Sequence, residues 1–295
     1  MRRTSELIAV ALVPLALSVI VAPAAQAAFP GANGAVVYSS EDDAWLLDPR
    51  TGDTTRLTHT RAREGLLDWN ATGTQIAYSR CTRSEFGNCE IWVMDADGSN
   101  PTQLTFSPDA QETWPAWSPD GTQIAYTSNA DDDSQDIWVM DADGANQTRL
   151  TVNTGVFDAF PEWSPDGTQI AFTSDSADLD DIWLMDADGS NPVRVTTGPK
   201  IDERPDWSPD GLHLIFSRSG KDIWQVDADG TNLVQLTDNG RPETAPAFSP
   251  NGKKIVFMKM SPGGEFRIWT MLADGTEPKR RTSGVFDAFP DWQPV

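Results

Sequence analysis

Short apolar runs separated by polar turns cover the chain from about residue 33 to its end. One repeat shows the unit clearly. Its runs are rich in β-branched and aromatic residues, and Pro119-Asp120-Gly121 and Asp141-Ala142-Asp143-Gly144 between them suit the dihedral angles of tight turns. The repeat therefore predicts four short antiparallel strands, at residues 115–118, 123–127, 136–140 and 148–151.

Tryptophan marks the same two places in each copy of this unit. On the predicted third strands it recurs at intervals of 47, 46, 45, 41 and 45 residues, at Trp45, Trp92, Trp138, Trp183, Trp224 and Trp269. On the predicted first strands the series is Trp69, Trp117, Trp163, Trp207, Phe248 and Trp292. A period of about 40–45 residues is typical of a propeller blade, a four-stranded unit that cannot bury its faces alone. We expect these rings to pack between blades.

The two ends of the repeat region complete each other. Residues 33–38 match a turn and a second strand but lack a first strand, whereas residues 289–294 are a first strand with nothing after it. The sequence therefore predicts an all-β fold, a six-bladed β-propeller of four-stranded antiparallel blades. Its C-terminal strand would complete the first blade and close the ring.

The repeated Trp-Ser-Pro-Asp-Gly segments, such as residues 163–167 and 207–211, resemble the TolB-like propeller family, with WD40-like repeats of the PD40 type. The resemblance covers residues 29–295 and extends to the closing Phe289-Pro290-x-Trp292-x-Pro294. We expect the chain to lack the separate N-terminal α/β domain of TolB. The resemblance implies that partner proteins engage the propeller at the mouth of its central channel.

The first residues have the pattern of a secretory leader. Arg2 and Arg3 precede an apolar run from Leu7 to Ala22, and Ala25-Gln26-Ala27 has the form of a cleavage site. We therefore expect a cleaved signal peptide at residues 1–27, a single propeller domain at residues 28–295, and a periplasmic or secreted location. Sec and Tat export both stay open.

Net charge restricts the classes of partner that the chain suits, and the two cysteines predict a disulfide. Removal of Arg2, Arg3 and Glu6 with the leader changes the net charge from −22 to −23, which disfavours nucleic acid and anionic lipid. We expect no nucleic-acid partner, no membrane insertion and a monomeric chain. Cys81 and Cys89, eight residues apart in one loop, predict a disulfide in an exported protein.

The candidate site lies on the loops between blades. The residue five positions before each first-strand aromatic is always a carboxylate: Glu64, Glu112, Asp158, Asp202, Glu243 and Asp287. We expect these acids to surround one mouth of the channel, with Trp114, Phe160 and Phe289 among them. Acids and aromatic rings at a concave mouth suit a cationic group or an extended peptide. The alternative is that repeated blades copy an acid with a structural role.

The leading hypothesis is an exported module that binds a protein or peptide of the cell envelope or extracellular space, without a cofactor. One alternative is a secreted polysaccharide hydrolase or lyase using two channel carboxylates. Another is a structural protein stabilised by a calcium ion in the channel mouth. The Asp-x-Asp-Gly turns fail the calcium-loop pattern, since Val93 and Leu104 occupy ligand positions, so no metal site is predicted there. No catalytic residue is predicted: neither His59 nor His213 lies in a catalytic motif.

Overall fold

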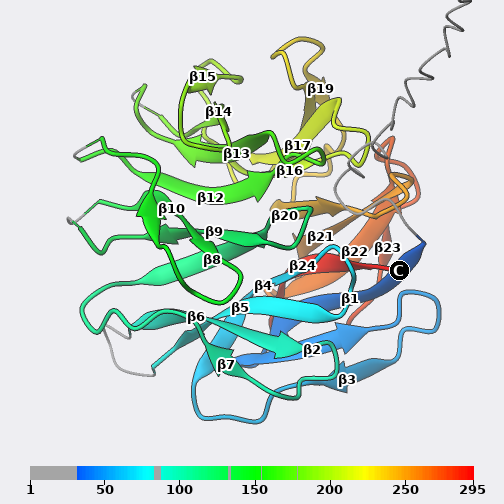
Figure 1. Cartoon of the computed structure of the whole chain (residues 1–295). Helices are drawn as coiled ribbons and strands as arrows, with labels where there is room; N and C mark the ends of the chain where they lie inside the picture. The colour runs from blue at the N-terminus through cyan, green and yellow to red at the C-terminus, as the bar shows by residue number, and fades with distance from the viewer. Residues whose placement is uncertain (1–31, 83–87, 132–133, 154, 178) are drawn as a thin grey trace, which may run out of the picture.

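The computed structural model describes residues 32–82, 88–131, 134–153, 155–177 and 179–295. Over these residues the regular structure is all β, in six four-stranded antiparallel sheets arranged as blades around a common centre (Figure 1). The expected six-bladed propeller is confirmed. The predicted signal peptide, residues 1–27, lies outside the described residues.

Each blade uses four consecutive strands, except the first, which borrows its innermost strand from the chain end. Blade 1 contains β24 (Asp287–Pro294), β1 (Asn33–Ser40), β2 (Asp43–Leu47) and β3 (Thr54–Arg56), and blade 2 contains β4 (Arg63–Trp69), β5 (Gln75–Cys81), β6 (Cys89–Asp95) and β7 (Thr102–Gln103). Blade 3 contains β8 (Glu112–Trp117), β9 (Gln123–Ser128), β10 (Asp136–Asp141) and β11 (Thr148–Arg149), and blade 4 contains β12 (Asp158–Trp163), β13 (Gln169–Ser174), β14 (Asp181–Asp186) and β15 (Val193–Arg194). Blade 5 contains β16 (Asp202–Trp207), β17 (His213–Arg218), β18 (Asp222–Asp227) and β19 (Val234–Gln235), and blade 6 contains β20 (Glu243–Phe248), β21 (Lys254–Met260), β22 (Phe266–Leu272) and β23 (Lys279–Arg280).

The ring closes by strand pairing between the two ends of the repeat region. β24 pairs antiparallel with β1, with Val36 opposite Trp292 and Ser40 opposite Asp287. Backbone hydrogen bonds between Ala32 and Val295, at 2.8 and 3.2 Å, extend this pairing. The closing strand therefore covers the edge of β1 that the first blade would otherwise expose.

The hydrophobic core consists of separate clusters between neighbouring blades. The cluster between blades 2 and 3, for example, joins Ile91 and Leu104 to Trp117, Tyr126 and Met140. The first-strand aromatics Trp69, Trp117, Trp163, Trp207, Phe248 and Trp292 are all buried. Their place in these clusters confirms that this tryptophan series is core between blades.

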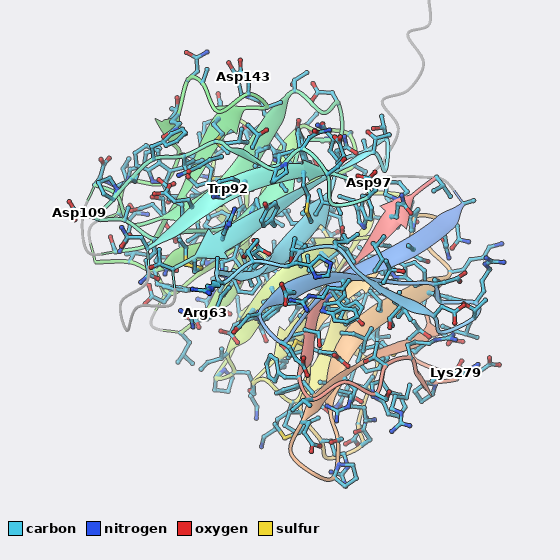
Figure 2. All side chains as sticks on the ribbon, turned by 90° about the horizontal axis from the view of Figure 1, so that it is seen from below. Arg63, Trp92, Asp97, Asp109, Asp143 and Lys279 are labelled. Carbon is cyan, nitrogen blue, oxygen red and sulfur yellow. A yellow bond between two sulfur atoms is a disulfide. The ribbon has the colours of Figure 1, made fainter. Side chains whose placement is uncertain are left out.

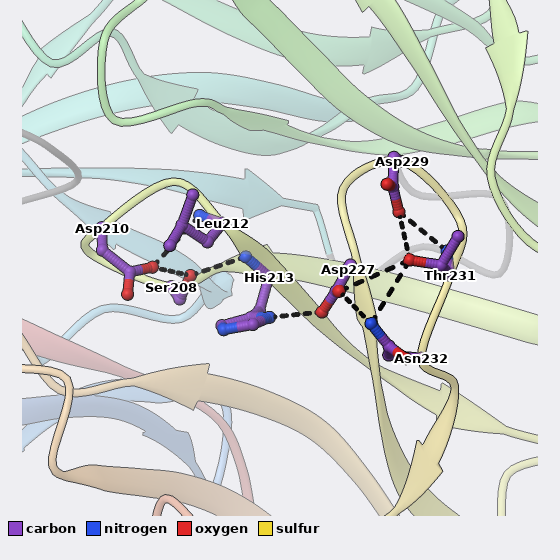
Figure 3. Close-up of polar contacts among 8 residues, drawn as sticks. All are labelled: Ser208, Asp210, Leu212, His213, Asp227, Asp229, Thr231 and Asn232. Atoms are coloured by element: carbon purple, nitrogen blue, oxygen red, sulfur yellow. Dashed lines mark hydrogen bonds and ion pairs between the residues drawn. The ribbon is translucent and has the colours of Figure 1, made fainter.

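The turns at one end of the blades repeat two hydrogen-bond patterns. In blade 5, Ser208 Oγ donates to Asp210 Oδ1 at 2.6 Å and accepts the backbone N–H of His213 at 2.9 Å (Figure 3). On the neighbouring turn, Asn232 Nδ2 donates to Asp227 Oδ2 at 2.7 Å, and His213 Nδ1 lies 2.7 Å from Asp227 Oδ1. These contacts explain the repeated Ser-Pro-Asp-Gly and Asp-x-Asp-Gly sequences as turn structure.

Some of the acidic side chains lie on loops at the surface. Figure 2 shows Trp92 on β6, and Asp97, Asp109 and Asp143 on loops beyond the strand ends. On blade 2, Cys81 and Cys89 face each other across β5 and β6 and are joined in a disulfide. Within the described residues, no helix is long and apolar enough to cross a membrane.

Candidate functional site

The six innermost strands share one irregularity, and it lines the central channel. Each strand carries a β-bulge: between Gly65 and Asp68, three residues advance along β4 while two advance along β5. Equivalent register shifts occur in the other five blades. The first residue of the bulge has a positive φ of 49° to 60° in every blade: Leu66, Trp114, Phe160, Arg204, Ala245 and Phe289.

Local sequence explains the bulge. In five blades the next residue is proline, at Pro115, Pro161, Pro205, Pro246 and Pro290. Proline has no N–H for a strand ladder, so it is placed on strand edges and at bulges. In some blades a hydroxyl of the preceding blade accepts the backbone N–H of the bulge residue. Thr173 Oγ1, for example, accepts the N–H of Arg204 at 3.1 Å. The strain of a positive φ in a residue other than glycine is about 1–3 kcal/mol, and such residues gather at binding sites.

The bulges surround a cavity of about 100 Å³ to which all six blades contribute. At its wall, Trp114 packs edge-to-face on Phe160 and on Phe289, with ring centroids 4.6 and 5.0 Å apart. The Arg204 guanidinium carbon lies 4.5, 4.7 and 5.1 Å from the centroids of Trp114, Phe160 and Phe289. We call these four residues the Arg204 cage. The three aromatic residues expected at the mouth are thus brought together, around a cation that the chain itself supplies.

Arg204 is held there without an ion pair to any residue that the structure describes. Its Nε and Nη1 atoms are buried and have no hydrogen-bond partner in the described part of the chain. Burial lowers the pKa of the guanidinium to about 10, while the charge of the adjacent Glu203 opposes this effect. The group therefore remains a cation at neutral pH, with unused donor capacity.

Two residues beyond the bulge residue, four blades place a carboxylate in the channel: Asp68, Glu162, Asp206 and Asp291. Burial, and then mutual repulsion, raise the pKa of Asp68 and Glu162 well above the usual range. Burial raises the pKa of Asp291 to about 7, against the opposing effect of hydrogen bonds from the backbone N–H groups of Trp69 and Trp292. Asp68 likewise accepts the N–H of Trp117 at 2.7 Å. Asp68, Asp206 and Asp291 each accept a backbone N–H of the next blade and so link neighbouring blades at the channel wall.

The six acids expected at the mouth are buried, and each is at most 2% exposed. Three of them pair with a cation on the next strand of the same blade. Arg80 Nε lies 3.3 Å from Glu64, Lys259 Nζ lies 2.7 Å from Glu243, and Arg218 makes two hydrogen bonds of 2.6 and 2.7 Å to Asp202. In each case the cation also stacks on a third-strand tryptophan: Trp92, Trp269 and Trp224.

The other three acids face serine at the same cross-strand position. Ser40 Oγ donates to Asp287 Oδ1 at 2.7 Å, and Ser128 and Ser174 lie opposite Glu112 and Asp158. Burial raises the pKa of Glu112 to about 7 and raises that of Asp158. The six acids are therefore internal to their blades, and the expectation of an open acidic ring is corrected. Whether any of them takes part in ligand binding stays a prediction.

The physical reason is the bulge. Its extra residue places Glu64 on the same face of the sheet as Trp69, since their partners Arg80 and Ile76 are four residues apart on β5. That face packs against another blade instead of facing the channel. Within the described residues, no group of three or more His, Cys, Asp or Glu side chains is arranged to hold a metal ion. A calcium ion at the mouth stays a prediction.

Sequence reasoning missed half of the positions around the channel: Leu66, Arg204 and Ala245, together with the four deeper acids. The signal was present, because Pro205 and Pro246 stand two residues before Trp207 and Phe248, as Pro115 stands before Trp117. A proline repeated inside a predicted strand indicates a bulge. No repeated residue type marks the bulge position itself, because its side chain differs from blade to blade.

A curated relative, the "Tol-Pal system protein TolB" of Albidiferax ferrireducens, is 41% identical over 61 residues, which is 21% of this chain and 13% of that protein. TolB from Acinetobacter baumannii has a similar solved structure, with a TM-score of 0.77 and 21% identity over 91% of this chain and 68% of that one. A putative TolB from Agrobacterium tumefaciens gives a TM-score of 0.71 and 24% identity over 88% and 92%. These structures support the fold.

A structure of a Nidogen/Laminin complex reaches a TM-score of 0.74 at 12% identity over 88% of this chain and 98% of that one, so the architecture extends beyond one sequence family. The family match is more specific. Residues 73–295 match the family described as "PD40: TolB beta propeller domain". Because this match spans most of the blades and of the chain, the protein belongs to the TolB-type β-propeller family.

Proposed function

We propose that this protein is an exported binding module whose propeller receives a segment of another protein at the channel mouth around the Arg204 cage. The observation that carries the proposal is the convergence of six strained bulge residues from six blades on one small cavity. The repetition of a strained residue in every innermost strand is explained if these side chains form a contact surface. Aromatic rings grouped around an arginine are also the residue types that dominate protein interfaces.

The relatives support a protein partner in the cell envelope. The curated relative is named as a Tol-Pal system protein, and the family is that of the TolB propeller. The leader pattern of residues 1–27 and the disulfide between Cys81 and Cys89 are both consistent with an exported chain. The match covers 13% of the length of that relative, so a partner of the relative is assigned to this chain only as part of this proposal.

Site-specific photocrosslinking in the producing cell tests the proposal. Benzoylphenylalanine in place of Ala245 puts the reactive group on the channel wall at the bulge residue with the smallest side chain. The matched control replaces Leu212, which is 61% exposed on a Pro-Asp-Gly turn away from the bulges. We expect one protein adduct at position 245 that is absent at position 212, with the crosslinked peptide identified by mass spectrometry. Adducts only at position 212, or none at 245 when the variant is folded, would refute the channel mouth as the site.

A further inference from the structure

Among the described residues, these cations stack on aromatic rings: Arg80, Arg204, Arg218 and Lys259. Three of them also pair with a buried carboxylate of the neighbouring strand. Arg204 makes no such pair among the described residues, although three rings hold it in place. In three places the fold thus combines a ring, a stacked cation and a paired carboxylate. At Arg204 the rings and the cation are present, but no described carboxylate pairs with the cation.

The missing element is an anion. A guanidinium that stacks on aromatic faces keeps its N–H edges for planar acceptors, and a carboxylate is the acceptor that matches this fork. In blade 5 itself, Arg218 shows the pairing, with two hydrogen bonds to Asp202 and a ring below it. Two of the Arg204 nitrogen atoms are buried without a hydrogen-bond partner among the described residues, so no hydrogen bond from these residues offsets their desolvation.

Access and position favour a ligand from outside the chain. Arg204 is partly exposed as a whole and lies on the wall of the 100 Å³ cavity that the six bulges surround. The adjacent Glu203 influences the charge of Arg204 but forms no ion pair with it in the described structure. An acceptor arriving there would therefore meet a cation that is positioned and desolvated. Asp68, Glu162, Asp206 and Asp291 line the same cavity, but none forms an ion pair with Arg204 among the described residues, and burial raises the pKa of each, which favours their neutral form.

We infer that the Arg204 cage is a carboxylate-binding site, which anchors the partner segment through an acidic side chain or a chain-terminal carboxylate. This inference rests on the proposed function and reverses the charge expected of the ligand, since the chain supplies the cation. The rings of Trp114, Phe160 and Phe289 fix the guanidinium, so that little side-chain freedom is lost on binding. The anion in turn offsets the desolvation of Arg204.

The test uses ¹⁹F NMR of the chain labelled with 5-fluorotryptophan. The Trp114 resonance is the one that disappears in Trp114→Phe, and Trp224 serves as the internal control because its arginine is already paired with Asp202. Titration with acetate, at constant ionic strength set by chloride, should shift the Trp114 resonance saturably and leave Trp224 unchanged. Acetamide and methylguanidinium should produce no saturable shift.

Two variants assign the effect to Arg204. Arg204→Gln should weaken acetate binding at least tenfold, whereas Arg204→Lys, which keeps the charge and loses the fork, should give an intermediate affinity. Unchanged resonances elsewhere show that each variant is folded. Two peptides then distinguish the sources of the carboxylate: acetyl-Ala-Glu-Ala-amide presents a side chain, and acetyl-Ala-Gln-Ala with a free C-terminus presents the chain end.

Equal acetate binding by the wild type and Arg204→Gln overturns the inference, as does a saturable response to methylguanidinium alone, which would show that the cage receives a cation. Crosslinking at position 245 does not depend on any of these outcomes. A partner captured there together with no Arg204-dependent acetate binding would retain the proposed function and reject the carboxylate anchor. No adduct at position 245 would reject the proposed function itself.

Discussion

At the scale of single residues, the same acid has different consequences in different blades. Glu64 and Glu112 occupy equivalent positions on β4 and β8, and both are almost fully buried. Arg80 neutralises Glu64, whereas Glu112 faces Ser128. A buried carboxylate without a cation holds its proton more tightly, so Glu112 has a pKa of about 7. The repeated acid is therefore an ion pair in some blades and a proton-binding group in another.

This difference predicts a pH-dependent effect of Glu112→Gln. The raised pKa means that the folded state binds a proton more tightly than the unfolded state, whose value is near the usual 4.5. The stability from this proton is full below about pH 4.5 and is lost as pH rises through 7. Because the amide does not titrate, the free energy of unfolding of the variant should gain about 2 kcal/mol on the wild type between pH 5 and pH 8. Urea unfolding at the two pH values measures the difference.

Glu64→Gln is the matched control at the equivalent position. It leaves the Arg80 guanidinium without its carboxylate, so it should destabilise the fold by about 1–3 kcal/mol at both pH values. A constant difference between Glu112→Gln and the wild type across this pH range would show that Glu112 does not hold a proton in the folded state.

At the scale of strands and turns, glycine sets how closely neighbouring blades approach. Gly144 has a φ of +87°, and a Cβ placed on it would lie 2.7 Å from the carbonyl oxygen of Leu104 in the preceding blade. Gly121 has a similar φ of +70° in the other turn of blade 3, but a Cβ there would meet nothing within 4 Å. Substitutions in the two turns can therefore distinguish the effect of backbone strain from that of a steric clash between blades.

Substitution of these two glycines should give unequal losses. Gly121→Ala carries the strain of a left-handed alanine alone, about 1 kcal/mol, whereas Gly144→Ala adds the displacement of the Leu104 backbone and should lose about 2–4 kcal/mol. The midpoints of urea unfolding for both variants and the wild type measure this order. Equal losses would mean that the blades shift apart at no cost.

The same scale shows what the sequence could predict. Strand positions, turn types and the ring closure followed from patterns copied through the blades, because each copy obeys the same local rules. The orientation of the acids did not follow, since one inserted residue in the bulge reverses which side of the strand faces the channel. The contacts of Arg204 could not be predicted for another reason. Its neighbours Trp114 and Phe289 belong to other blades, so only the closed ring brings them together.

At the scale of the whole molecule, the ring depends on one strand contributed by the opposite end of the repeat region. β24 covers β1, places Trp292 between blades and brings Asp291 and Phe289 to the channel. The amide of Trp69 in blade 2 donates to Asp291 at 3.0 Å, so the closing strand also contacts the blade beyond the first. The strand that closes the ring therefore also contributes to the proposed site.

Two rearranged chains test whether closure requires the strand itself or its place in the sequence. A chain lacking residues 287–295 exposes the β1 edge and leaves a cavity in place of Trp292. It should therefore lose several kcal/mol, comparable with the total stability of a typical domain, and unfold without a single cooperative transition.

A circular permutant, which keeps the closing strand but moves it to the start of the chain, should tolerate this rearrangement. Since Ala32 and Val295 are hydrogen-bonded neighbours, a short turn can join them, with new ends placed between Thr282 and Ser283. The permutant retains every strand pair, and its urea midpoint should remain close to that of the wild type. A truncated chain with the wild-type midpoint would show that the blades hold together without closure, and an unfolded permutant would show that the order of the strands in the chain matters beyond their pairing.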